Sequence, residues 1–159
     1  LMGVEPVEGS IQGSGASGNS ALAVARSPPC QKRGITLLCD YVAAPVRTPI
    51  GEVERILDEL VGNALDYAQS QVRIDVTDDG QRVRLEVRDD GPGIPRDERE
   101  RVFTRFTRGS QSIPGGTGLG LALVRQAALA SGGDVKIVDS ETGACFEVSW
   151  PSLAESEVQ

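Results

Sequence analysis

Two runs of alternating apolar residues, at positions 72–76 and 83–87, most constrain how this chain can fold. Every second residue in them is Val, Ile or Leu, which is the pattern of a strand with one buried face. Asp79 and Gly80 lie between the runs and favour a tight turn. The pattern therefore predicts an antiparallel hairpin whose second strand leads directly into Asp89 and a glycine-rich turn.

A helix is predicted before the hairpin, over residues 52–68. Apolar side chains recur there every three or four positions and therefore stack on one helical face; they are Val53, Ile56, Leu57, Leu60 and Ala64. The edge of this stripe is lined by Glu59, Asn63, Asp66 and Tyr67. Thr48 and Pro49 suit the cap and the first position of the helix.

Weaker patterns place the remaining elements. Strands are expected at 35–41, 135–138 and 145–150, and Pro151 ends the last of them. Helices are expected at 20–26, 96–102 and 119–130, and the last of these ends at Gly132 and Gly133.

Composition limits the chain to one packed domain. Of its 159 residues, 39% are hydrophobic, which is enough for a single core at 20–151. Residues 1–19 are rich in Gly and Ser and predict a flexible tail, and residues 152–159 predict a disordered one.

Several functions are disfavoured by composition. The net charge of -7 argues against nucleic-acid binding, which requires clustered Lys and Arg. Three widely spaced cysteines without histidine partners favour neither a disulfide framework nor a zinc site, and they fit a reducing, cytoplasmic setting. No apolar run is long enough to cross a bilayer, so we expect no direct membrane insertion.

Asp89, Gly91 and Gly93 form a D-x-G-x-G motif at the end of the second hairpin strand. The missing Cβ atoms let a planar ligand lie against the backbone, and the carboxylate can accept a hydrogen bond from the exocyclic amine of adenine. The alternative is an ordinary turn with a solvated Asp.

A second glycine-rich stretch spans residues 115–121 and leads into the helix predicted at 119–130. Backbone N–H groups and the helix N-terminus can converge there on an anion, and glycines would also suit a lid. The stretch lacks the spacing of a Walker loop or of a dinucleotide-binding fold. A plain flexible loop is the alternative.

Asn63 lies in the middle of a helix beside an apolar stripe, where an amide is costly unless it has partners. It is either a satisfied core Asn or an oxygen ligand to a Mg²⁺ ion that bridges nucleotide phosphates. Glu59, one turn earlier, could orient water or the metal. Tyr67, one turn later, either packs on the base or ribose or is plain packing.

Two aromatic and two basic residues, Phe103, Arg105, Phe106 and Arg108, precede the second glycine-rich stretch. The Arg side chains can reach triphosphate oxygens. The Phe pair is interpreted as an exposed docking patch or as an anchor for the lid, with two core residues as the alternative.

In order and spacing, the Asn-bearing helix and the D-x-G-x-G, F-x-R-F and G-T-G-L-G-L motifs resemble the catalytic ATP-binding domain of bacterial sensor histidine kinases, which belong to the Bergerat-fold (GHKL) superfamily. The resemblance runs from about Ser20 to Pro151. It implies an α/β (α+β) two-layer sandwich in which a mixed sheet of about five strands packs on three helices, with ATP between the helices and a lid.

The resemblance also implies roles for individual residues, with ATP and Mg²⁺ as cofactors. Asn63 and Glu59 would hold the metal, and the catalytic residues would be Glu59, Asn63 and Arg105. The nucleotide-binding residues would be Asn63, Tyr67, Asp89, Gly91, Gly93, Ile94, Arg108, Gly116, Thr117, Gly118, Leu119, Gly120 and Leu121.

Two positions depart from the pattern of the sensor kinases. Glu59 stands where they usually carry Asn, as in gyrase-like ATPases and serine-kinase anti-sigma factors, which brings water activation or a different acceptor into play. Asp66 stands where they usually carry a Lys that contacts phosphate, and its charge would repel phosphate. We therefore expect weak nucleotide affinity or low activity.

The expected function is that of an ATP-dependent protein-histidine kinase domain, which donates the γ-phosphoryl group in two-component signal transduction. The chain has no His, so the acceptor lies in a dimerisation segment outside this sequence or on a separate protein. We favour a stand-alone half of a split kinase that acts in trans on a partner dimerisation domain, which then passes the phosphoryl group to a response regulator. The alternatives are a serine-kinase anti-sigma factor and a catalytically weak nucleotide-binding regulator. The isolated chain is expected to be a cytoplasmic monomer, membrane-associated only through a partner.

Overall fold

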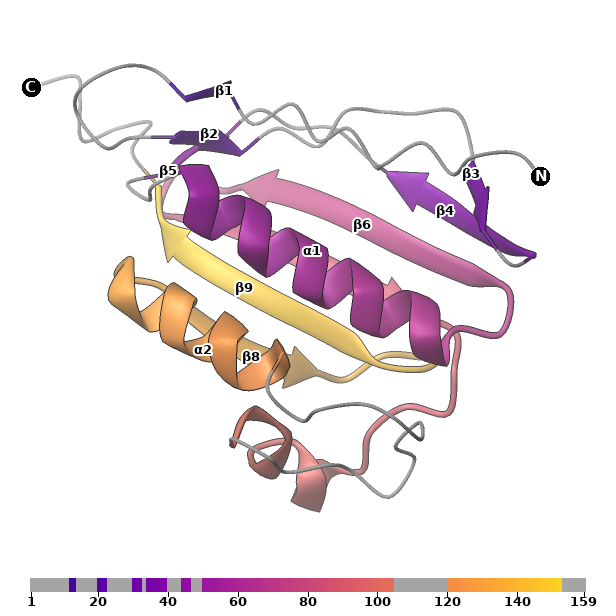
Figure 1. Cartoon of the computed structure of the whole chain (residues 1–159). Helices are drawn as coiled ribbons and strands as arrows, with labels where there is room; N and C mark the ends of the chain where they lie inside the picture. Colours follow the sequence, from indigo (N-terminus) through magenta and orange to yellow (C-terminus); the bar gives the residue numbers. More distant parts are fainter. Residues whose placement is uncertain are drawn as a thin grey trace, which may run out of the picture.

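One large mixed sheet with helices on one face organises this protein (Figure 1). The structure is a computed structural model and describes residues 12–13, 20–22, 30–32, 34–39, 44–46, 50–104 and 120–152. The sheet order is β3-β4-β6-β7-β9-β8. The strands are β3 (Cys30–Lys32), β4 (Ile35–Cys39), β6 (Gln71–Asp78), β7 (Arg82–Asp89), β8 (Asp134–Val138) and β9 (Cys145–Pro151). The mixed sheet of about five strands is confirmed, with the three-residue β3 as an additional edge strand.

The central hairpin forms as the alternating pattern predicts. β6 and β7 pair antiparallel, with Val72 opposite Asp89 and Asp78 opposite Val83. At the turn, Asp79 Oδ1 accepts hydrogen bonds from the N–H groups of Gln81 (2.9 Å) and Arg82 (2.7 Å). Alternate residues of both strands are buried, and the residues between them are charged and face away from the helices.

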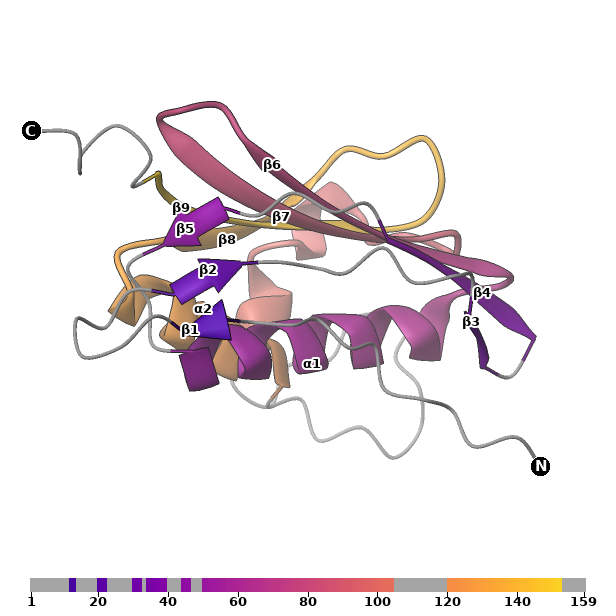
Figure 2. The ribbon, with the colours of Figure 1, turned by 90° about the horizontal axis from the view of Figure 1, so that it is seen from above.

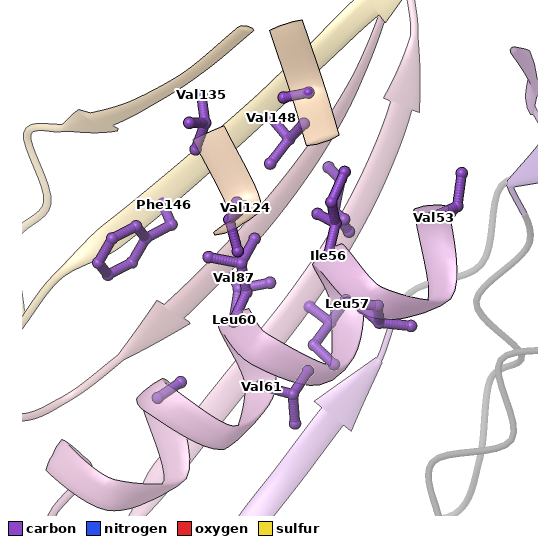
Figure 3. Packing of buried hydrophobic residues seen from close by; sticks show 14 of the residues in the cluster. Val53, Ile56, Leu57, Leu60, Val61, Val87, Val124, Val135, Phe146 and Val148 are labelled. Carbon is purple, nitrogen blue, oxygen red and sulfur yellow. The ribbon is translucent and has the colours of Figure 1, made fainter. Parts of the chain in front are cut away.

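Two α-helices, α1 (Ile50–Tyr67) and α2 (Gly120–Ala130), cover the same face of the sheet (Figure 2). The predicted apolar stripe of α1 is buried throughout. Its side chains belong to one core cluster with Val87, Phe146 and Val148, and Figure 3 shows most of them. Each fully buried side chain of this size stabilises the fold by about 1.5–3 kcal/mol.

The position of α1 follows from the one parallel pair among the described strands of the large sheet, β4 with β6. Parallel neighbours cannot be joined by a tight turn, so the chain must cross over between them, and α1 makes this crossing. As a result, the C-terminal end of α1 lies beside the end of β7, where Gly91 approaches the Tyr67 carbonyl group.

The helix predicted at 20–26 is wrong for its first three residues, and residues 23–26 lie outside the described part of the chain. Ser20–Leu22 forms β2, which pairs with β1 (Gln12–Gly13) and β5 (Ala44–Val46) in a separate three-stranded sheet. A helix of two turns is marginal on its own, so pairing with two neighbouring strands outweighs the helix propensity of alanine.

The helix predicted at 96–102 is replaced by two single turns of 3-10 helix, η2 (Arg96–Glu98) and η3 (Arg101–Phe103). The segment is charged up to its end, and η2 buries no side chain. Without an apolar face to pack on the sheet, a continuous α-helix gains little from its environment.

Both predicted tails lie mostly outside the described residues. Within them, Gln12–Gly13 forms β1, and Ser152 is buried with its N–H donating to the Gln81 carbonyl (2.9 Å). In the described part of the chain, no helix is both long enough and apolar enough to span a bilayer. Cys145 is a buried free thiol.

Candidate functional site

Asp89 ends β7 on the face of the sheet that the helices cover, and it is only 3% exposed. Its Oδ1 accepts hydrogen bonds from the N–H of Gly91 (2.8 Å) and the N–H of Ala144 (3.3 Å). Both hydrogen bonds end on Oδ1, so neither of them occupies Oδ2, which can accept a hydrogen bond from a ligand. The strand alternation places this carboxylate inside because Val83, Leu85 and Val87 share its face.

The surroundings of Asp89 raise the pKa of its carboxyl group. Burial raises the pKa of the carboxyl group, and the hydrogen bonds from Gly91 and Ala144 oppose this by stabilising the carboxylate. The negative charge of the neighbouring Asp90 raises the pKa further. The net effect is a pKa above the ordinary value of an Asp.

The D-x-G-x-G turn is pressed between two other segments of the chain. A Cβ at Gly91 would collide with the Tyr67 carbonyl oxygen and lie 3.0 Å from Asp89 Oδ1. Gly93 has φ +78°, and a Cβ there would lie 3.1 Å from the Gly143 carbonyl oxygen. The missing Cβ atoms are therefore explained by contacts within the protein, whereas the sequence pattern predicts space for a ligand.

Gly143 belongs to this site and was not predicted from the sequence. It lies in the loop between β8 and β9 and has φ +62°. A Cβ at this position would collide with the Asp89 carbonyl oxygen and come within 2.6 Å of Asp89 Oδ1. Only a turn-like Ser-Glu-Thr-Gly run marks it in the sequence, which does not show that the loop lies behind Asp89.

α1 forms a second side of the candidate site, next to the turn after β7. Glu59, Asn63 and Tyr67 are four residues apart and so follow one another along one face of the helix, and all three are partly buried. The Glu59 carboxylate lies against Gly120, where a Cβ would collide with its Oε2. α1 therefore brings Glu59 to the N-terminus of α2, where a helix presents unpaired N–H groups.

Other predicted site residues are divided between the core and the part of the chain that is not described. Ile94 and Leu121 are partly buried against the hydrophobic core, and Gly120 is the first residue of α2. The predictions for Arg105, Phe106, Arg108, Gly116, Thr117, Gly118 and Leu119 lie outside the described residues.

Phe103 is a core residue, so its interpretation as an exposed docking patch is wrong. It is 5% exposed and packs edge-to-face on Phe146, with ring centroids 6.1 Å apart. The Arg125 guanidinium lies over the Phe103 ring at 5.4 Å from the centroid and pairs with Glu100 (Nη1 to Oε2, 3.0 Å). These contacts join η3 to α2.

Asn63 and Glu59 carry side-chain oxygens of the kind that Mg²⁺ takes as ligands. No group of three His, Cys, Asp or Glu side chains gathers to hold a metal in the described part of the chain. Mg²⁺ suits such a site, because it is usually held by one or two protein oxygens together with phosphate oxygens and water. The amide of Asn63 and the carboxylate of Glu59 would supply such oxygens, and Asp89 would supply an acceptor for the base.

Comparisons with known proteins show which family the chain belongs to. The family model for "Histidine kinase-, DNA gyrase B-, and HSP90-like ATPase" matches residues 50–154, more than half of the chain. The chain is 48% identical to the sensor protein RstB of Escherichia coli over 103 residues, which cover 62% of this chain and 24% of RstB. It is 38% identical to the sensor histidine kinase MtrB of Mycobacterium tuberculosis over 135 residues, covering 80% of this chain and 24% of MtrB.

Solved structures are similar over a larger share of their length. The mycobacterial sensor histidine kinase MprB superposes with a TM-score of 0.64 at 29% identity, covering 73% of this chain and 79% of that one. The catalytic domain of histidine kinase ThkA gives a TM-score of 0.62 at 27% identity, covering 72% and 77%.

The chain belongs to the histidine kinase-, DNA gyrase B- and HSP90-like ATPase family. Its fold and sequence are those of the ATP-binding catalytic domain of sensor histidine kinases. The chain spans about a quarter of the length of RstB and MtrB.

Proposed function

We propose that this domain binds Mg-ATP between α1 and the turn after β7, and donates the γ-phosphoryl group to a histidine on a dimerisation domain. Asp89 carries the proposal, because its buried carboxylate keeps Oδ1 occupied by two backbone N–H groups and leaves Oδ2 to accept from adenine. Asn63 and Glu59 would hold Mg²⁺, and Arg105 would neutralise charge on the transferred group. Mg-ATP, when bound, supplies the phosphoryl group.

The acceptor lies outside these residues, because the chain contains no His. The contribution of this domain is therefore positioning and charge neutralisation, and the partner supplies the nucleophile. A response regulator would then take the phosphoryl group from the partner. We propose transfer in trans to a separate chain or segment that carries the histidine.

Labelled ATP, mixed with this chain and candidate dimerisation domains, tests the proposal. We expect acid-labile phosphohistidine on a partner. The nucleotide-site variant Asp89→Asn is the negative control and should give none. Acid-stable phosphoserine would instead favour a serine-kinase anti-sigma factor. Stabilisation by ATP without transfer to any partner would leave a nucleotide-binding regulator.

Asp66 is expected to weaken the affinity for Mg-ATP. It is an exposed residue in the last turn of α1, three positions after Asn63, where its charge would repel phosphate. Reversing this charge with Asp66→Lys should lower the Kd for Mg-ATP roughly twofold to fivefold, in the range of exposed charge interactions. The gain should shrink as salt is added, because salt screens exposed charges.

Glu54→Lys is the matched control for Asp66→Lys. Glu54 is also exposed on α1, but it lies half a turn around the helix from Asn63. The Glu54→Lys substitution makes the same change in net charge, but away from the site. The Kd of this variant for Mg-ATP should therefore stay close to that of the wild type. An equal decrease in the Kd for Mg-ATP in both variants would contradict the expected effect of Asp66. A wild-type Kd already in the low micromolar range would also contradict it.

A further inference from the structure

Asp90 joins the C-terminal end of α1 to the turn after β7. Its Oδ1 accepts hydrogen bonds from the N–H groups of Gln69 (2.8 Å), Ser70 (3.0 Å) and Gln71 (3.1 Å). Its Oδ2 accepts from the Ser70 hydroxyl group. Gln69 and Ser70 lie in the connection from α1 to β6, and Gln71 is the first residue of β6; the three residues are 19 to 21 positions from Asp90 in the sequence. A single carboxylate therefore holds two segments that are distant in the chain.

Each of these segments carries residues of the nucleotide site. Tyr67 is the last residue of α1 and lies two positions before Gln69, while Asp89 directly precedes Asp90. The Tyr67 carbonyl oxygen already approaches the turn so closely that Gly91 has no room for a Cβ. The hydrogen bonds of Asp90 to Gln69, Ser70 and Gln71 tie the residues just after Tyr67 to this same turn.

We infer that Asp90 is a positioning residue of the nucleotide site, which holds Asn63 and Tyr67 in register with Asp89 without touching the nucleotide itself. This inference rests on the proposed function of the site. Burial raises the pKa of Asp90, but the hydrogen bonds from Ser70, Gln71 and Gln69 outweigh this and lower the pKa to about 2. The carboxylate therefore stays ionised, and its bonds persist, under ordinary assay conditions.

Asp79 offers a matched control within the same pair of strands. Its carboxylate also accepts from backbone N–H groups, those of Gln81 and Arg82, and it pairs with Arg84 (Oδ2 to Nη1, 2.7 Å). It lies at the opposite end of the β6–β7 hairpin, about 26 Å from Asp90 along the strands. Loss of either carboxylate removes a turn-stabilising group, but only Asp90 adjoins the site.

The test measures the Kd for Mg-ATP and the Tm of the full chain for the wild type, Asp90→Ala, Asp90→Asn and Asp79→Ala. We expect Asp90→Ala to raise the Kd on the order of tenfold, because small displacements of positioning groups are costly. Asp90→Asn keeps one acceptor oxygen and should recover part of the affinity. Asp79→Ala should lower the Tm and leave the Kd within about twofold of the wild type.

The outcomes separate the inference from the proposed function. A Kd for folded Asp90→Asn and Asp90→Ala equal to that of the wild type would overturn the positioning role. A rise in Kd for Asp79→Ala as large as that for Asp90→Ala would also overturn it, because the effect would then follow stability alone. If Asp90→Ala does not fold, Asp90→Asn decides by the same criterion. A wild-type chain that binds no Mg-ATP would overturn the proposed function itself.

Discussion

Asp89→Asn is expected to weaken Mg-ATP binding at least a hundredfold and to leave the fold intact. The new side chain keeps Oδ1 as acceptor for the N–H groups of Gly91 and Ala144. At the Oδ2 position, however, it places an NH₂ group that would face the exocyclic amine of adenine, donor against donor. When a binding site depends on one buried acceptor, losing that acceptor reduces the binding free energy by about 3 kcal/mol or more.

Asp89 should also make the affinity of the wild type for Mg-ATP depend on pH. Because Oδ1 already accepts two hydrogen bonds, a proton would reside on Oδ2 and convert the acceptor for adenine into a donor. Burial raises the pKa of Asp89, so affinity is present above this raised pKa and is lost as the pH falls through it. Affinity should therefore decline at a higher pH than for an ordinary Asp.

Isothermal titration with Mg-ATP over a range of acidic to neutral pH values checks both expectations. Asp75→Asn is the control, because Asp75 lies on the charged face of β6, away from the helices, and pairs with Arg73 (3.0 Å). It removes one charge without entering the site. A Kd for Asp89→Asn within threefold of the wild type would contradict the role assigned to Asp89.

Trp150→Ala is expected to destabilise the domain by about 3–5 kcal/mol, the range for removing a buried aromatic side chain. Trp150 is fully buried near the end of β9. Its Nε1–H donates to Ser131 Oγ (3.0 Å), just beyond α2, and Gly133 leaves room for its ring, because a Cβ there would lie 2.7 Å from Cδ1. The substitution removes a packed ring between the last strand and the end of α2.

Urea unfolding of three variants separates packing from hydrogen bonding. Trp150→Phe keeps most of the buried ring but leaves Ser131 Oγ without its donor, so it should cost about 1–2 kcal/mol beyond the loss of volume. Leu129→Ala changes an apolar side chain of α2 that is 56% exposed, and it should stay within about 0.5 kcal/mol of the wild type. A loss of unfolding free energy below about 1 kcal/mol for Trp150→Ala would contradict this prediction. It would mean that the residues around position 150 collapse into the cavity that the ring leaves.

The elements with strong periodicity could be predicted from the sequence. The stripe of α1, the alternation of β6 and β7 and the end of α2 near Gly132 depend on side chains within a few positions of one another. Weakly patterned segments could not be predicted in this way. Ser20–Leu22 became a strand because β1 and β5 pair with it, and the charged segment after Pro95 has too little apolar surface for an α-helix.

The placement of some candidate site residues was predictable for the same reason. The alternation of β7 determines that Asp89 faces the helices, and the four-residue spacing determines that Glu59, Asn63 and Tyr67 share a side of α1. Phe103 shows the limit of this reasoning. Its place in the sequence is equally compatible with an exposed patch and with the core, and only its contacts with Phe146 and Arg125 distinguish the two.

By itself, the sequence determined the strongly periodic elements of this protein and the order in which the motifs of its candidate nucleotide site occur. Only the tertiary structure decided which backbone segments meet at Asp89: the Gly143 loop behind it, and the end of α1 that Asp90 holds in place. The physical reason is that these contacts join residues far apart in the chain. They depend on the strand order and the α1 crossover, which local periodicity does not encode.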